Sequence, residues 1–330
     1  MLIAGTNPEF PIRVYGGQPV AYSENLSFVA NVISLDPVHR GKKCSGALIT
    51  NNTVLTTANC LISNSQSWYN PHLISVSFNG GSNKFMVRNT ITASGYHLGM
   101  FSDNIGLITL ASSVAPEIAR PIGVYFGPLD ESLDVYSLGY GRVNDTVAGT
   151  SPKHAQIVQM QLMPNSQCLG YAEYDRNTQV CANGKDRGGL CGGDEGSPLV
   201  TEIGNADAGY ALVGIASFRT HRPDSQDEGC GRRNGDGLVY YEKGAPWAAW
   251  ISRMTGVSAE SLLVAGGQSG MLDESMHVSA QSGAVHGSNS SINTLDQDTA
   301  ESKESSASSH NTVWWSFVFC VFTISIFGLV

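Results

Sequence analysis

Charged side chains are scarce in this sequence. Asp, Glu, Lys and Arg make up 14% of the 330 residues, and 19 Lys and Arg stand against 28 Asp and Glu. Residues 1–255 hold 18 basic and 21 acidic residues, whereas residues 256–330 hold 1 and 7. No basic stripe is available to neutralise phosphates, so no nucleic-acid partner is expected. The hydrophobic share of 42% is typical of a globular protein and excludes a wholly disordered chain.

The sequence also has no Cys-x-x-Cys pair among its seven cysteines. An even set of six in the globular part is typical of disulfides rather than of a metal site, so we expect neither a metal nor a cofactor. The seventh, Cys320, lies in a hydrophobic C-terminus. The six are Cys44, Cys60, Cys168, Cys181, Cys191 and Cys230.

Long helical patterns are missing between residues 25 and 245. Short apolar runs broken by Gly, Asn, Asp and Pro predict an all-β barrel or sandwich. One helix is expected near residues 246–254, because Pro246 suits a first turn and Trp247, Trp250, Ile251 and Met254 follow at helical spacing. The predicted strands are 28–34, 47–57, 73–78, 105–110, 135–140, 157–163, 210–218 and 238–241.

From residue 256 the composition changes. Residues 256–312 are rich in Ser and acidic residues and poor in large apolar ones, which predicts a flexible stalk. Residues 313–330 are apolar, without charge and without a basic flank. Such a tail is typical of a GPI-attachment signal, with Ser305 or Ser306 as acceptor; the alternative is a single membrane span.

Export is expected from the tail together with the disulfides and the sequons. Disulfides and Asn-x-Ser/Thr sequons are compatible with an extracellular, membrane-attached protein. Residues 1–10 lack a charged n-region and a long apolar segment, so we expect the signal peptide to be missing from this sequence. The sequons begin at Asn25, Asn51, Asn144 and Asn289.

The cysteine neighbourhoods resemble the chymotrypsin/trypsin-like serine protease family. Cys44-Ser-Gly-Ala-Leu-Ile-Thr and Val54-Leu-Thr-Thr-Ala-Asn-Cys60 are similar to CGGSLI and VLTAAHC. Asp103-Asn-Ile-Gly-Leu-Ile-Thr-Leu resembles DIALLKL, and Gly139-Tyr-Gly141 resembles GWG. Cys191-Gly-Gly-Asp-Glu-Gly-Ser-Pro-Leu199 resembles CxGDSGGPL, and Leu212-Val-Gly-Ile-Ala-Ser-Phe218 resembles LVGIVSW.

This resemblance implies two packed, antiparallel six-stranded β-barrels over residues 14–255, with a short C-terminal helix and a cleft between the barrels. It implies the disulfides Cys44–Cys60, Cys168–Cys181 and Cys191–Cys230. Residues 1–13 then resemble a propeptide, since Arg13-Val14 is similar to the family's activation site and Asp194 is the residue that pairs with the freed amino terminus.

The catalytic positions implied by the resemblance are altered. Acyl transfer in this family needs a hydroxyl nucleophile, an imidazole base and an orienting carboxylate. Asp103 is assigned to the carboxylate, Asn59 stands at the imidazole position and Glu195 at the nucleophile position. An amide is no general base, and a carboxylate opposes the oxyanion that the backbone of Gly193 and Glu195 should stabilise.

The primary pocket is expected to differ as well. Gly189 stands where trypsins carry an aspartate, and Ser217, Phe218 and Arg219 form the opposite wall. Arg219 replaces a glycine, so we expect it to obstruct the pocket. Two positions are open for its guanidinium: an ion pair with Glu195, or solvent.

Together these features predict an inactive serine protease homologue at the cell surface, with a binding, decoy or regulatory role toward a protein or other extracellular ligand in the cleft. One alternative is an active serine endopeptidase. Another is a carboxylate-pair hydrolase that uses Asp103 and Glu195.

Overall fold

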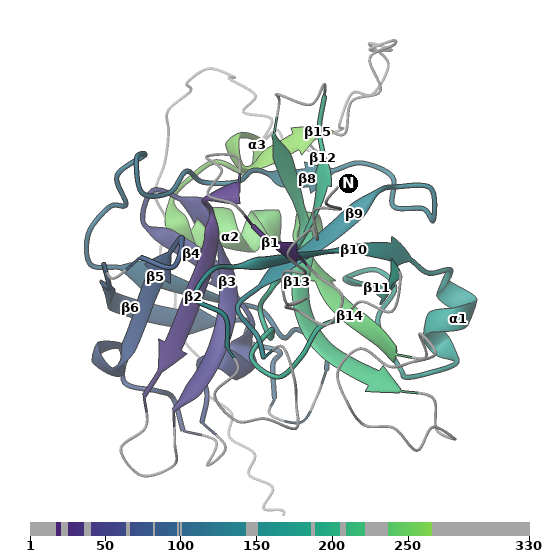
Figure 1. The fold of residues 1–330 in the computed structure, drawn as a ribbon, viewed down its shortest axis with the longest axis horizontal. Coiled ribbons are helices and arrows are strands. Elements are labelled where there is room, and N and C mark those ends of the chain that lie inside the picture. The colour runs from purple at the N-terminus through teal and green to yellow at the C-terminus, as the bar shows by residue number, and fades with distance from the viewer. Residues whose placement is uncertain are drawn as a thin grey trace, which may run out of the picture. The chain divides into compact units, whose positions relative to one another are not determined.

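The computed structural model (Figure 1) describes most of the region between residues 18 and 265. The described ranges are 18–20, 26–35, 41–63, 67–81, 83–97, 99, 101–142, 151–185, 189–204, 209–221 and 237–265.

The first half of the described chain forms a closed antiparallel barrel in the order β2-β3-β4-β7-β6-β5. In β5, the buried residues Ile74, Val76 and Phe78 alternate with Ser75 and Ser77, as a half-buried strand requires. The six strands are β2 (Val29–Ser34), β3 (Lys42–Thr50), β4 (Thr53–Thr56), β5 (Ile74–Phe78), β6 (Phe85–Thr92) and β7 (Gly106–Leu110).

The second half forms another ring, β12-β9-β10-β11-β14-β13, which a β12–β13 pairing closes. All neighbouring pairs in this ring are antiparallel. The strands are β9 (Val135–Gly139), β10 (Gln156–Leu162), β11 (Gln179–Gly184), β12 (Pro198–Glu202), β13 (Tyr210–His221) and β14 (Gly237–Lys243). The predicted pair of six-stranded antiparallel barrels is therefore confirmed.

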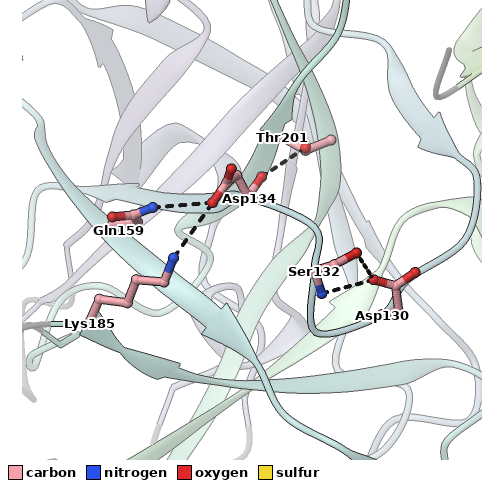
Figure 2. Close-up of polar contacts among 6 residues, drawn as sticks. All are labelled: Asp130, Ser132, Asp134, Gln159, Lys185 and Thr201. Atoms are coloured by element: carbon pink, nitrogen blue, oxygen red, sulfur yellow. Dashed lines mark hydrogen bonds and ion pairs between the residues drawn. The ribbon is translucent and has the colours of Figure 1, made fainter. Parts of the chain in front are cut away.

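Polar side chains tie together the strand ends on one side of the second barrel (Figure 2). Asp134, just before β9, accepts a hydrogen bond from Gln159 of β10 at 3.3 Å and lies 3.5 Å from the Lys185 ammonium. Thr201 of β12 donates to the Asp134 carbonyl at 2.9 Å. In the preceding turn, Ser132 donates to Asp130. These contacts fix the start of β9 against its neighbours.

Short strands and helices complete the described fold. β1 (Gln18–Pro19) pairs with β10, and β8 (Val124–Phe126) pairs in parallel with β13. The short helices are η2 (Ala58–Cys60), η3 (Pro71–Leu73), α1 (Asn165–Leu169), η5 (Ala245–Trp247), α2 (Ala248–Thr255) and α3 (Ala259–Leu262). The expected C-terminal helix is thus present as η5 and α2, with Ile251 buried and Met254 exposed.

The folded region continues past the predicted boundary at residue 256. Gly256 ends α2 at φ 75°, and Ser258 caps α3 by accepting a hydrogen bond from the Ser261 amide at 3.3 Å. Leu262 is buried, and β15 (Leu263–Ala265) then pairs in parallel with β8. The prediction of a stalk from residue 256 is therefore wrong for the first ten residues, because this segment covers apolar surface.

The rest of the predicted stalk, the acceptors Ser305 and Ser306 and the tail 313–330 lie outside the described residues. Within the described part, none of the helices has the length and apolar character needed to cross a bilayer.

Candidate functional site

The residues predicted for catalysis come from three segments that meet where the barrels face each other. Asn59 lies in η2, directly after β4, and Glu195 lies in the turn before β12. Gly193 and Gly196 bracket Glu195 with φ values of 96° and 82°, a conformation that favours glycine. A Cβ on Gly196 would collide with the carbonyl of Ser45, so this turn packs tightly on β3.

The third segment corrects one prediction by one residue. The amide of Asn59 donates to Oδ1 of Asn104 at 2.9 Å, and Nδ2 of Asn104 donates to Oγ of Ser217 at 2.9 Å. Asn104 is buried with 2% exposure. The side chain that lies beside Asn59 is therefore Asn104, and the assignment of Asp103 to this position is wrong.

Asp103 points elsewhere because its backbone leaves the extended conformation. Its φ is 55°, and its carboxylate packs against Gly95, where an added Cβ would overlap it. Asp103 is not among the residues that line the cavity beside Glu195. Its structural role is to hold the turn around Gly95.

The orientation of the Asn104 amide follows from its partners. The Asn59 N–H can only donate, so it must face the Asn104 oxygen, which leaves the NH₂ group toward Ser217. A carboxylate would accept on both sides and carry a negative charge. Asn104 is neutral, so no carboxylate contacts Asn59 from this position. The Asn59 side chain is itself held by Thr57, whose hydroxyl donates to Oδ1 at 2.8 Å.

The side chain of Glu195 bends back onto its own turn. Its Oε2 accepts a hydrogen bond from the amide of Gly193 at 2.8 Å. This amide is one of the two backbone donors predicted to stabilise an oxyanion. A carboxylate of the protein therefore occupies that donor in this structure.

Lys42 supplies a cation close to Glu195. Its ammonium donates to the Asn59 carbonyl at 2.8 Å. Burial lowers the pKa of Lys42, and the Glu195 charge acts in the opposite direction. The ammonium thus links the Asn59 and Glu195 segments electrostatically.

Asp194 is buried beneath this turn. Its Oδ1 accepts from the Gly141 amide at 2.7 Å and its Oδ2 from the Cys191 amide at 2.9 Å. Burial raises the pKa of Asp194 to about 6. Its predicted partner, the amino group of Val14 after cleavage at Arg13, lies outside the described residues.

A cavity of about 230 Å³ opens beside Glu195. Leu190, Asn59, Ser217, Phe218 and Arg219 contribute to its lining, and Gly189 precedes Leu190 in the chain. The expected obstruction by Arg219 is wrong, since Arg219 forms part of the wall and leaves this volume open. Its guanidinium donates to the Leu190 carbonyl at 3.4 Å, and no Arg219–Glu195 ion pair occurs among the described residues.

Two features of the site were not predicted. Phe218 has a ring on each face: Phe101 stacks on it at a centroid distance of 4.1 Å and Tyr240 at 4.4 Å. Phe101 is half exposed. The sequence around Phe101 gives no sign of this stack, because the two other rings, Phe218 and Tyr240, lie more than 100 residues away along the chain.

The second is Glu242, a fully buried carboxyl behind Asn104. Its Oε1 accepts from the Asn104 amide at 3.3 Å and from Nε2 of Gln179 at 2.6 Å. The same Gln179 nitrogen donates to the Phe101 carbonyl at 2.5 Å. Burial raises the pKa of Glu242 to about 7, and the Asp103 charge adds to this effect. The pattern Leu238–Glu242 in β14, where inward Tyr240 precedes Glu242 by two, could have placed it inside.

Two of the three predicted disulfides, Cys44–Cys60 and Cys168–Cys181, are present. Cys191 is also disulfide-bonded, and its predicted partner Cys230 lies outside the described residues. Asn51 is exposed in the turn between β3 and β4. The sequons at Asn25, Asn144 and Asn289 are outside the described part. The described residues contain no group of three His, Cys, Asp or Glu side chains that could hold a metal ion.

Comparison with known proteins agrees with this architecture. The family model described as Trypsin matches residues 16–236. The chain belongs to the trypsin family. Two similar members are trypsin delta of Drosophila erecta, 27% identical over 256 residues that cover 76% of this chain and 91% of the relative, and trypsin alpha of Drosophila melanogaster, 28% identical over 222 residues that cover 65% and 80%.

A longer protein is also similar to this chain. Mannan-binding lectin serine protease 1 of Mus musculus is 24% identical over 268 residues, which cover 74% of this chain and 36% of that protein. Trypsin-family membership thus accounts for the two barrels and for the site between them.

Proposed function

We propose that this chain is a catalytically inactive trypsin-family protein that acts at the cell surface as a binding, decoy or regulatory protein. The observation that carries the proposal is the hydrogen bond from the Gly193 amide to the Glu195 carboxylate. It places a fixed negative charge on the donor that a developing oxyanion needs.

The neighbours of Glu195 support the same conclusion. The trypsin-family mechanism requires a hydroxyl, an imidazole and a carboxylate in contact. The corresponding three places hold Glu195, Asn59 and Asn104, and none of these side chains can perform its expected step at neutral pH. Substitution at all three positions leaves no acid–base pair to transfer a proton between nucleophile and leaving group.

A binding role follows from what remains. The cavity beside Glu195 keeps about 230 Å³ of open volume. Its wall carries amide, hydroxyl and guanidinium groups from Asn59, Ser217 and Arg219. A cleft that retains volume and polar donors can hold a segment of a protein or another extracellular ligand without cleaving it.

The geometry does not support the alternative of a carboxylate-pair hydrolase. It needs two carboxylates that face one substrate. Asp103 packs against Gly95 and does not line the cavity that contains Glu195. The active-endopeptidase alternative rests on family membership, and it is the one that experiment must exclude.

The surface location is part of the proposal and rests on the sequence. Disulfides at Cys44–Cys60 and Cys168–Cys181 are compatible with an oxidising compartment. The apolar, uncharged segment 313–330 would supply a GPI signal or a span. Release of the protein from intact cells by a phosphatidylinositol-specific phospholipase would identify a GPI anchor, whereas retention would indicate a span.

The test of inactivity is labelling with a fluorophosphonate probe, which reacts with activated serine nucleophiles. The native full chain is compared with Glu195→Ala and with a triple reversion, Asn59→His, Asn104→Asp and Glu195→Ser. N-terminal sequencing of each sample establishes whether the chain begins at Val14. We expect no labelling of the native chain and labelling of the triple variant at residue 195.

Labelling of the native chain that persists in Glu195→Ala would reveal a nucleophile elsewhere and overturn the proposal. The pair Asn59→His with Glu195→Ser, leaving Asn104 in place, is the matched control. It should react more slowly than the triple variant, because the imidazole then lacks its orienting carboxylate.

A further inference from the structure

A second cavity of about 350 Å³ lies on the first barrel. It is bounded by Trp68, by the end of β6 and by the turn that follows β6. Figure 1 shows β6 on the side of the first barrel that lies away from β14. No residue lines both this cavity and the one beside Glu195. We call the second cavity the Trp68 groove; its main lining residues are Trp68, Thr90, Ile91, Thr92, Ser94 and Tyr96.

The polar side-chain groups of the Trp68 groove have no hydrogen-bond partner among the residues that the structure describes. The hydroxyls of Thr90, Thr92, Ser94 and Tyr96 have no hydrogen bond to any residue in the described part of the chain, and neither has the indole N–H of Trp68. Each hydroxyl can donate one hydrogen bond and accept two. Four hydroxyls around one opening therefore offer both donors and acceptors to a ligand.

An aromatic face completes the lining. Trp68 is 55% exposed, although large aromatic side chains usually bury most of their surface. The backbone of Trp68 forms an isolated β-bridge with Ile62. Tyr96 lies deeper, with 9% exposure. The Trp68 groove thus combines a flat apolar surface with hydroxyls, and none of its described lining residues carries a charge.

The turn that carries Ser94 and Tyr96 is held from behind. Asp103 packs against Gly95, and the Tyr96 amide donates to the Ala93 carbonyl at 3.2 Å. The opening itself arises because β6 pairs with β5 only at Phe85 and Met86. The remainder of β6 pairs with β7 alone.

We propose that the Trp68 groove binds a neutral sugar residue of a glycan. The C–H face of the sugar ring stacks on the Trp68 indole, and its hydroxyls exchange hydrogen bonds with Thr90, Thr92 and Ser94. The absence of charged groups from the lining favours a neutral, polyhydroxylated ligand over phosphates or acidic and basic peptide side chains. The site is independent of the cavity beside Glu195, so the proposal holds whether or not that cavity is catalytic.

The competing occupant is an extended peptide added to the open edge of β6. Backbone pairing would not need the indole or the hydroxyls. The side-chain chemistry of the Trp68 groove therefore distinguishes a sugar from a peptide. We favour the sugar because the groups that have no hydrogen-bond partner among the described residues, the hydroxyls and the indole N–H, belong to side chains.

The experiment uses the full chain after enzymatic removal of its own N-glycans. The deglycosylated protein is applied to an array of neutral oligosaccharides, and the oligosaccharide that binds most strongly is titrated by calorimetry. We expect at least one neutral oligosaccharide to bind and Trp68→Ala to weaken binding about tenfold, with Trp68→Phe retaining part of the affinity. Thr90→Val with Thr92→Val, which keeps the shape and removes two hydroxyls, should also weaken binding.

Phe126→Ala removes another exposed aromatic side chain outside the Trp68 groove and serves as the matched control, with no change expected. Circular dichroism verifies that each variant is folded. The proposal is overturned if no neutral oligosaccharide binds, or if binding is unaffected by Trp68→Ala. Binding of library peptides in place of sugars, insensitive to the threonine variants, would assign the groove to strand addition instead.

Discussion

Replacing Glu242 by glutamine should change the pH dependence of stability. Glu242 has 0% exposure, and burial raises its pKa to about 7 from the ordinary 4.5. A carboxyl with a raised pKa in the fold favours folding when protonated. Its stabilising contribution is fully present below pH 4.5 and is lost as the pH rises through 7.

The size of this effect follows from the two pKa values. A rise from 4.5 to about 7 corresponds to about 3 kcal/mol, since each pKa unit is worth about 1.4 kcal/mol. The glutamine does not titrate, and its oxygen can still accept from Gln179 and Asn104. Among the described residues Oε2 accepts no hydrogen bond of ordinary geometry, although the Trp247 indole lies near enough to lower the pKa of Glu242. The NH₂ group that replaces Oε2 adds a cost of about 1–3 kcal/mol that is independent of pH.

The assay is urea unfolding of both proteins at several pH values between 4.5 and 8.5. The free energy of unfolding of Glu242→Gln relative to the native chain should rise by about 3 kcal/mol across this range. Asp194 titrates in both proteins and cancels in the difference. Glu260→Gln, at an exposed position, is the control and should follow the native curve. A difference between Glu242→Gln and the native chain that stays constant with pH would refute the reasoning.

Two further predictions concern stability. Leu262→Ala should lower the free energy of unfolding by about 2–5 kcal/mol, because Leu262 is buried at 3% exposure; an unchanged unfolding curve would mean that α3 is not part of the folded domain. Cys168→Ser with Cys181→Ser should cost about 3 kcal/mol, because the bond closes a loop with a sequence separation of 13; calorimetry under oxidising conditions measures it, and a loss below about 1 kcal/mol would contradict the estimate from loop entropy.

The fold was accessible from the sequence because its signals are local. Strands such as Ile74–Phe78 alternate visibly, and the segments around Cys44 and Cys191 keep their order along the chain. The altered positions Asn59 and Glu195 were found for the same reason. Each stands next to a cysteine or a glycine that fixes its place.

The residue at the position of the orienting carboxylate was predicted wrongly, because the expected mechanism and the strand pattern point to different residues. The mechanism calls for an acid, which directed attention to Asp103. The apolar pattern from Ile105 to Leu110 instead places Asn104 in the strand register, and the positive φ of Asp103 turns that residue away. Asp adopts a positive φ more readily than most residues, but the sequence does not mark which Asp does so.

The remaining features depend on long-range contacts. Glu242, Gln179 and Phe101 meet across segments separated by more than 60 residues, so neither periodicity nor spacing indicates that they contact one another. The strand pattern of β14 could only have placed Glu242 inside the barrel. The C-terminal boundary was placed too early for a similar reason. The polar residues 256–261 resemble a linker in composition, and only the burial of Leu262 and the β8–β15 pairing reveal that they are packed.

The central claim is that this trypsin-family site does not cleave peptide bonds. The most direct measurement is mass-spectrometric detection of products after prolonged incubation of the purified full chain with a combinatorial peptide library, with Glu195→Ala and heat-denatured protein in parallel. The account predicts that the three samples give the same products. Cleavage by the native chain above the heat-denatured sample, reproduced in independent preparations, would contradict it.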